Sequence, residues 1–333
     1  MAPPSPSRHL LVPFAGRSGD ASPACRAALS ALRLPNLEAL LGRLAPDPGR
    51  DDAQAGTTLS PPHERALARA LGMPFEDGLI PWAAREAQHS GLSRAGSGEP
   101  WALLTLCHWE VAVDQVVLDD PDGIAITEAE SLALLEAARP FFQEDGISLR
   151  RSATPGRWLA RGELFRTLPT ASVDRVAGQS IADWAPLSDA LKPVRKLQNE
   201  MQMLLYTQRV NDERVARGTQ PINSFWLSGT GALPKDVKDA REGKPSKDTP
   251  RVIDTLRRPA LDDDPAAWSA AWQALDAGPV AELLAASTRG EAVVLTLCGD
   301  RAARSFVPRK GGALDWLRRR FRRTSTTAVL EAL

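Results

Sequence analysis

The sequence has few cysteines and no excess of charge of either sign. Its 333 residues include three cysteines, Cys25, Cys107 and Cys298, which lie far apart and form no Cys-x-x-Cys pair. An odd number of isolated cysteines argues against a disulfide framework or a structural zinc site, and it fits a reducing compartment. Because 41 basic residues balance 41 acidic ones, the overall charge steers the protein toward neither nucleic acid nor an anionic membrane.

Long apolar runs are also missing. No stretch stays apolar for the roughly 18 residues that a membrane-spanning helix needs. The first residues, MAPPSPSRHLLVPFA, lack the long apolar run and the small-residue cleavage site of a signal peptide. We therefore expect a cytoplasmic protein without a membrane span. The composition is that of an ordinary globular protein, and the length favours two lobes.

The hydrophobic pattern predicts strands separated by helices on both sides of an inserted segment. Residues 9–15 indicate a short buried strand, and residues 34–44 an amphipathic helix. Between residues 100 and 170, alternating strands surround a helix that begins with Thr127 and Glu130 in capping-box spacing. We expect an α/β core with an inserted α+β lobe. The expected boundaries are 1–95 and 181–333 for the core, the latter with a basic carboxyl-terminal helix, and 96–180 for the lobe.

The stretch VNDERVARGTQPINSFWLSGTGALP, residues 210–234, is the strongest site candidate. Its Ser-Gly-Thr-Gly sequence follows a predicted strand, and glycines beside a small hydroxyl residue can bring backbone N–H groups close to an anion. A tight structural turn explains the same residues equally well. Asn211 and Asn223 favour a structural role, in which they bind neighbouring backbone. The candidate phosphate-binding residues are Arg214, Arg217, Asn223, Ser228, Gly229, Thr230 and Gly231.

Other conspicuous side chains have structural explanations. His108 and Cys107 are neighbours on a predicted strand, so their side chains point to opposite faces and make a poor nucleophile pair. We expect His108 to be a satisfied core or interface histidine. Nine tryptophans against one tyrosine is unusual. We expect Trp226, Trp268 and Trp272 to fill hydrophobic cores rather than a ligand site.

Nine positions of the 210–234 stretch resemble a motif of a known family, the cofactor-independent phosphoglycerate mutases of the archaeal type, in the alkaline-phosphatase-like superfamily. The segments LPNLEALL and WALLTLCHWEV are similar to two further segments of that family. More narrowly, the chain resembles a bacterial group labelled phosphoglycerate mutase or regulator of pathogenicity factors, E type. The matching positions are Val210, Asn211, Arg214, Gly218, Pro221, Asn223, Trp226, Gly229 and Gly231.

The resemblance implies an alkaline-phosphatase-like, mostly parallel sheet core, with residues 10–12 and 225–227 as strands of one sheet. It also implies two metal ions held by Asp and His, with a serine as phosphoryl acceptor. The first strand of the family ends at a metal-binding Asp, whereas this sequence offers Pro13, Phe14 and Ala15, and no histidine follows His108. We therefore expect no bound metal or cofactor.

Three functions remain open. The leading interpretation is a non-catalytic ligand-binding or regulatory protein that takes a small phosphorylated ligand. One alternative is an active phosphoglycerate mutase or phosphohydrolase with a rearranged carboxylate site. The other is an interaction module whose basic carboxyl-terminal helix binds an acidic partner. The arginines of that helix are Arg318, Arg319, Arg320, Arg322 and Arg323.

Overall fold

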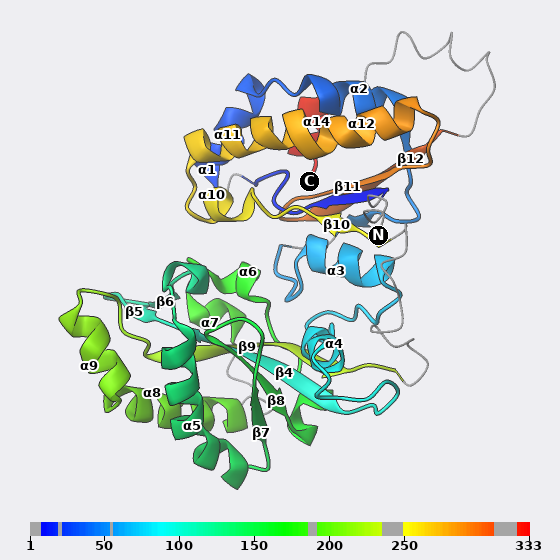
Figure 1. Cartoon of the computed structure of the whole chain (residues 1–333). Coiled ribbons are helices and arrows are strands. Elements are labelled where there is room, and N and C mark those ends of the chain that lie inside the picture. Colours follow the sequence, from blue (N-terminus) through cyan, green and yellow to red (C-terminus); the bar gives the residue numbers. More distant parts are fainter. Residues whose placement is uncertain (1–7, 19–21, 54–55, 186–191, 235–248, 310–324) are drawn as a thin grey trace. The chain divides into compact units, whose positions relative to one another are not determined.

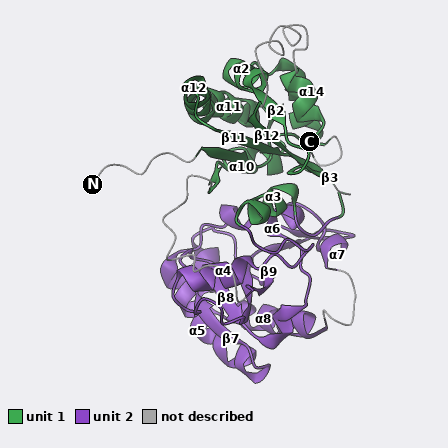
Figure 2. Cartoon of the chain, turned by 90° about the vertical axis from the view of Figure 1, so that its right-hand side faces the viewer, with its two compact units in different colours: residues 1–57, 61–71, 245–333 green, residues 58–60, 72–244 purple. Residues whose placement is uncertain are grey.

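The computed structural model divides the chain into two compact units (Figure 2). Unit 1 contains residues 1–57, 61–71 and 245–333, and unit 2 contains residues 58–60 and 72–244. Each unit has a hydrophobic core of its own. The residues that the structure describes are 8–18, 22–53, 56–185, 192–234, 249–309 and 325–333.

The sheet of unit 1 is mixed. Its strands, within the described residues, follow the order β10 (Arg251–Val252), β1 (His9–Val12), β11 (Val294–Cys298), β12 (Ala302–Pro308) and β2 (Leu44–Pro46), and β3 (Asp52–Ala53) also pairs with β12. Strand β1 runs parallel to β10 and β11, whereas β12 runs antiparallel to β11, β2 and β3. The short connection between β11 and β12 permits only an antiparallel pair. The expectation of a mostly parallel core is therefore wrong.

Helices cover both faces of this sheet (Figure 1). They are α1 (Pro23–Ala28), α2 (Pro35–Arg43), α3 (Pro62–Ala70), α10 (Arg257–Leu261), α11 (Pro265–Leu275), α12 (Ala281–Thr288) and α14 (Thr326–Glu331), with the 3-10 helix η1 (Leu29–Ala31) and the π-helix η5 (Asp276–Val280). Successive side chains of a strand point to opposite faces. Leu10 therefore joins the cluster of α2 and α11, which includes the buried Trp268 and Trp272, whereas Leu11 packs with α3.

Unit 2 is built on a separate antiparallel sheet. Its strand order is β7 (Ser148–Arg151), β8 (Arg157–Arg161), β4 (Pro100–Cys107) and β9 (Ser224–Ala232), and a hairpin is formed by β5 (Trp109–Val111) and β6 (Val116–Leu118). The helices are α4 (Trp82–His89), α5 (Glu128–Glu144), α6 (Val173–Val176), α7 (Ile181–Trp184), α8 (Lys192–Tyr206) and α9 (Arg209–Ala216), with the turns η2 (Pro121–Gly123) and η3 (Glu163–Arg166). Leu104 packs with α5 and α8 on one face, and Trp101 packs with α4 on the other.

Two local predictions hold in unit 2. Thr127 caps α5, and its hydroxyl accepts the backbone N–H of Glu130 while the Glu130 carboxylate accepts the backbone N–H of Thr127, which completes the capping box. Trp226 is buried in the core, and its indole N–H donates to the carbonyl of Ala171. The capping box can be read from the sequence because its two partners are only three residues apart, whereas Trp226 bonds to a residue 55 positions away.

The pairing of strand β9 differs from the expected architecture. Its residues pair with β4 from Ser224↔Cys107 to Ala232↔Pro100, so Phe225–Leu227 and β1 lie in different sheets. The expectation that they share one sheet is wrong. The expected boundaries also differ from the observed division, because α8, α9 and β9 pack within unit 2, which extends to residue 244.

Candidate ligand-binding pocket

The Ser-Gly-Thr-Gly residues lie inside strand β9 and not in a turn after it. Ser228 pairs with Leu103 and Gly231 with Trp101, and the register shifts between these pairs, which marks a bulge. The predicted turn is therefore wrong. The bulge explains the glycines, because Gly229 and Gly231 have φ of 62° and 127°, backbone conformations that L side chains rarely adopt.

Close packing gives a second reason for these glycines. A Cβ at Gly229 would lie 3.1 Å from the Cβ of Trp82, and one at Gly231 would lie 3.2 Å from the carbonyl oxygen of Leu79. Between them, the buried hydroxyl of Thr230 lies 2.6 Å from the carbonyl oxygen of Leu168 and donates to it. The segment thus packs against its own protein, and phosphate binding there stays a prediction.

Arg214 and Arg217 reach Glu130 and not the glycines of β9. Arg214 is 2% exposed; its Nη1 lies 3.1 Å from Glu130 Oε2, and it also donates to the carbonyls of Gln220 and Ile124. Nη2 of Arg217 lies 2.7 Å from Glu130 Oε1. Both cations are therefore engaged by a carboxylate of their own unit.

The environment of Glu130 keeps this carboxylate ionised. Burial alone would raise the pKa of Glu130, but the hydrogen bonds from Thr127 and the charge of Arg214 outweigh that effect and hold the pKa below its usual value. Glu130 thus caps α5 and anchors α9 at once.

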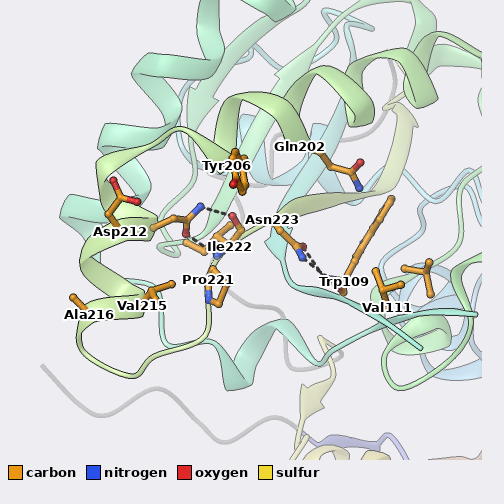
Figure 3. Close-up of a pocket in the computed structure, with 12 residues that line it drawn as sticks. Trp109, Val111, Gln202, Tyr206, Asp212, Val215, Ala216, Pro221, Ile222 and Asn223 are labelled. Carbon is orange, nitrogen blue, oxygen red and sulfur yellow. Dashed lines mark hydrogen bonds between the residues drawn. The ribbon is translucent and has the colours of Figure 1, made fainter. Parts of the chain in front are cut away.

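Asn211 and Asn223 have the expected structural role. The Asn211 amide donates to the carbonyls of Leu205 and Ile222 and accepts the backbone N–H of Ile222 at 2.8 Å. The Asn223 side chain accepts the backbone N–H of Trp109 at 2.7 Å and donates to its carbonyl at 2.9 Å. The bonds of Asn211 with Ile222 and of Asn223 with Trp109, drawn as dashed lines in Figure 3, hold residues 221–223 between α9 and the β5–β6 hairpin.

His108, next to the same hairpin, is satisfied as expected. One of its ring nitrogens, Nδ1, lies 2.8 Å from the carbonyl oxygen of Pro221. Cys107 is buried and Asn223 donates its backbone N–H to the Cys107 carbonyl. The histidine thus helps to fix the segment that the two asparagines hold.

These bonds build one wall of a pocket of about 890 Å³ in unit 2 (Figure 3). The pocket lies between α8, α9, the hairpin and residues 221–223. Apolar groups dominate its lining, which contains no lysine or arginine, and Asp212 is its one ionisable carboxylate. The lining residues are Trp109, Val111, Val116, Gln202, Tyr206, Asn211, Asp212, Val215, Ala216, Pro221, Ile222 and Asn223.

Sequence reasoning missed this pocket, although a signal was present. Leu197, Met201 and Leu205 form the buried face of α8, so Tyr206, which is 87% exposed, stands outside that face. Val215 is 62% exposed on α9, whose buried positions are Asn211 and Arg214. Large apolar side chains at helix positions that face solvent are a sign of an interaction surface when several lie together.

The carboxyl edge of the unit 1 sheet was the expected place for family metals, and its side chains do not fit them. Phe14 stands at this edge with φ of 56°, and its carbonyl accepts the indole N–H of Trp268 at 3.2 Å. The Phe14 ring lies 5.3 Å from the ring of His63 and 5.4 Å from the Arg17 guanidinium. Arg17 also forms an ion pair with Asp300, the carboxylate that follows β11.

A divalent metal needs several anionic or imidazole donors around one point. The edge instead combines a phenyl ring with a guanidinium that neutralises the carboxylate. Within the described ranges, no group of three or more His, Cys, Asp or Glu side chains could hold a metal ion. Of the neighbouring aspartates, Asp264 caps α11 and Asp263 accepts the N–H groups of Ala24 and Cys25.

The predicted basic helix and the expected absence of a membrane span are the remaining expectations from the sequence. The arginines of the predicted basic helix, residues 318–320, 322 and 323, lie outside the described residues. Binding of an acidic partner there stays a prediction. None of the described helices combines the length and apolar character that crossing a membrane requires.

No protein-family model and no curated protein sequence matches the chain. Among solved structures, the chain is similar to the cofactor-independent phosphoglycerate mutase from Thermoplasma acidophilum DSM 1728, with 14% identity and a TM-score of 0.36 over 91% of this chain and 89% of that one. It is also similar to the PH0037 protein from Pyrococcus horikoshii, with 11% identity and a TM-score of 0.43 over 93% of this chain and 89% of that one. Both are likenesses of fold only.

Proposed function

We propose that the protein is a non-catalytic binding protein whose unit 2 pocket takes an apolar group of its ligand. The observation that carries this proposal is the lining of the pocket, where valine, tryptophan, tyrosine and proline side chains predominate and no cation is present. Its volume of about 890 Å³ lies within the range of about 300–1,000 Å³ that is usual for ligand sites.

A phosphorylated ligand, the earlier expectation, has weaker support. An anion needs cationic or N–H donors that are free to turn toward it. Arg214 and Arg217 instead bind Glu130, and the Thr230 hydroxyl donates within the fold. An apolar ligand requires no such donors, because the removal of apolar surface from water supplies the binding energy.

The phosphoglycerate mutase or phosphohydrolase alternative has less support than binding alone. Phosphoryl transfer depends on positive charge that stabilises the transferring group. At the carboxyl edge of the unit 1 sheet, the guanidinium of Arg17 is already paired with Asp300, and Phe14 stands next to them. The donors that two catalytic metals need are not assembled among these side chains.

The proposal is tested by titration with N-phenyl-1-naphthylamine, a neutral apolar fluorophore. We expect saturable binding that Val215→Asp weakens about tenfold, because a charge beside the bound ring must be desolvated. Val252→Asp is the matched control, since Val252 is an exposed valine of unit 1, and it should leave the affinity unchanged. If the wild-type protein and both variants bind the fluorophore with equal affinity, or if none of them binds it, the fluorophore does not bind in this pocket and the proposal is wrong.

Catalysis is tested separately with 3-phosphoglycerate and Mn²⁺. We expect no turnover by the purified full-length chain. Turnover above that of a heat-denatured sample would contradict the non-catalytic part of the proposal, whatever the fluorophore shows.

A further inference from the structure

Further exposed apolar side chains lie on the elements that border the pocket. Eight large hydrophobic side chains are exposed in the described residues, and five of them belong to α8, α9 and the β5–β6 hairpin. Three line the pocket, the fourth lies in the turn of the hairpin, and the fifth follows Gln202 in the sequence of α8. The five are Val111, Val113, Met203, Tyr206 and Val215. Contiguous exposed apolar surface on a protein commonly marks an interaction site.

Three exposed carboxylates lie on the same elements as these apolar side chains, and no ion pair is observed for them among the described residues. Glu110 and Asp114 belong to the hairpin, and Asp212 lines the pocket from α9; all three are exposed. Across the described part of the chain, no hydrogen bond or ion pair involves any of these three carboxylate groups. The guanidinium of Arg209 pairs with Glu213 at 2.7 Å.

We infer that this surface, Val111, Val113, Met203, Tyr206 and Val215 with the carboxylates of Glu110, Asp114 and Asp212, binds a basic amphipathic peptide segment of a partner protein. The inference rests on the proposed function and names its occupant. Apolar side chains of the segment enter the pocket and cover the exposed valines and Tyr206, and its lysines or arginines face the carboxylates. This is the chemistry by which amphipathic helices bind apolar grooves, with charge selecting the partner.

Other occupants fit these features less well. A small molecule within the pocket leaves Val113 and Met203 uncovered, since neither lines it. Nucleic acid and anionic membranes are repelled by the three carboxylates. A second copy of the chain would have to place a carboxylate-rich surface against a complementary basic one.

The test uses two fluorescein-labelled helical peptides of about 18 residues with the same leucine face, one with lysine and the other with glutamate at the remaining charged positions. Fluorescence anisotropy with the full-length protein measures both affinities at low and at high salt. We expect the lysine peptide to bind at least about tenfold more tightly than the glutamate peptide. Salt should reduce this difference, because exposed charges are screened.

Asp114→Asn examines the contribution of charge, because Asp114 belongs to the hairpin turn and does not line the pocket. The substitution should weaken binding of the lysine peptide several-fold while leaving the affinity for N-phenyl-1-naphthylamine unchanged. Glu144→Gln, which neutralises an exposed carboxylate at the end of α5, should affect neither. Thermal melting of each variant identifies any loss of folding.

Three results would overturn the inference. Equal binding of the two peptides would show that the carboxylates do not select the partner. Binding of the fluorophore but of neither peptide at millimolar concentration would leave the proposed function intact and make the pocket a small-molecule site. Sedimentation of the protein as a dimer that Val113→Asp dissociates would identify a second copy as the occupant.

Discussion

Arg214 of α9 and Glu130 of α5 form an ion pair that is nearly removed from solvent, with side chains that are 3% and 10% exposed. The same arginine donates to the carbonyl groups of Gln220 and Ile124. Glu130 meanwhile completes the cap of α5. One pair thus connects the start of α5, the end of α9 and residue 220, which directly precedes the pocket residues 221–223.

Removal of Arg214 should strongly destabilise the protein. Arg214→Ala leaves Glu130 buried with only Arg217 as a cationic partner, and breaking a buried pair from one side typically costs about 3–5 kcal/mol. Urea unfolding measures the change in the free energy of unfolding. Arg209→Ala is the control, because Arg209 pairs with Glu213 on the surface and such pairs contribute about 0–1 kcal/mol. Equal decreases in the free energy of unfolding of the two variants would show that the buried Arg214 pair stabilises the protein no more than a surface pair does.

Glu130 should make the free energy of unfolding depend on pH in the acid range. Its folded-state pKa is lowered from the usual 4.5, so its stabilising contribution is present above that value and is lost as the pH falls toward the folded pKa. Glu130→Gln should therefore flatten the decline of unfolding free energy below about pH 4.5, although it is less stable at neutral pH. An acid profile with the wild-type slope would show that Glu130 does not contribute to it.

Gly229→Ala should destabilise unit 2 more than an alanine at another left-handed glycine. Gly229 has φ of 62° and a crowded neighbourhood, whereas Gly146 has φ of 72° with nothing within 4 Å of an added Cβ. Both variants incur backbone strain of about 1 kcal/mol, and only Gly229→Ala adds contact with Trp82 and Leu103. Thermal melting compares them. Equal shifts in melting temperature would show that the close packing is not needed.

All three cysteines should resist thiol reagents in the folded protein. Each is buried, and burial together with a hydrogen bond and the charge of Asp263 raises the pKa of Cys25 to about 12. Burial likewise raises the pKa of Cys107 and Cys298. The reactive thiolate is thus scarce near about pH 8. We expect DTNB to label none of them until urea is added, and rapid labelling of the native protein would contradict the described burial.

Local patterns in the sequence predicted local features, and tertiary contacts determined the rest. The capping box of Thr127 and Glu130 and the backbone bonds of Asn211 could be anticipated because the partners lie within a few residues or follow from the chemistry of the side chain. The strand at Phe225 was anticipated too. Its pairing with β4 was not, because a hydrophobic run contains no information about which distant strand it joins.

The candidate site was misplaced for the same reason. Ser228–Gly231 looks like an anion-binding turn when read along the chain, but the positive φ angles serve a bulge against β4. Arg214 is close to these residues in sequence, yet its partner Glu130 belongs to a distant helix. The pocket requires side chains from α8, α9 and the hairpin to meet, and no local spacing rule describes that meeting.

An apolar pocket, and not the glycine segment, is the proposed ligand site of unit 2. The most direct measurement is a pair of amide chemical-shift titrations of the isotope-labelled full-length protein, one with N-phenyl-1-naphthylamine and one with 3-phosphoglycerate. We predict shifts at Trp109, Tyr206 and Val215 with the fluorophore and none at residues 228–231 with the phosphate compound. Saturable shifts at residues 228–231 with 3-phosphoglycerate, together with no response of the pocket residues to the fluorophore, would place the ligand site at the glycine segment instead.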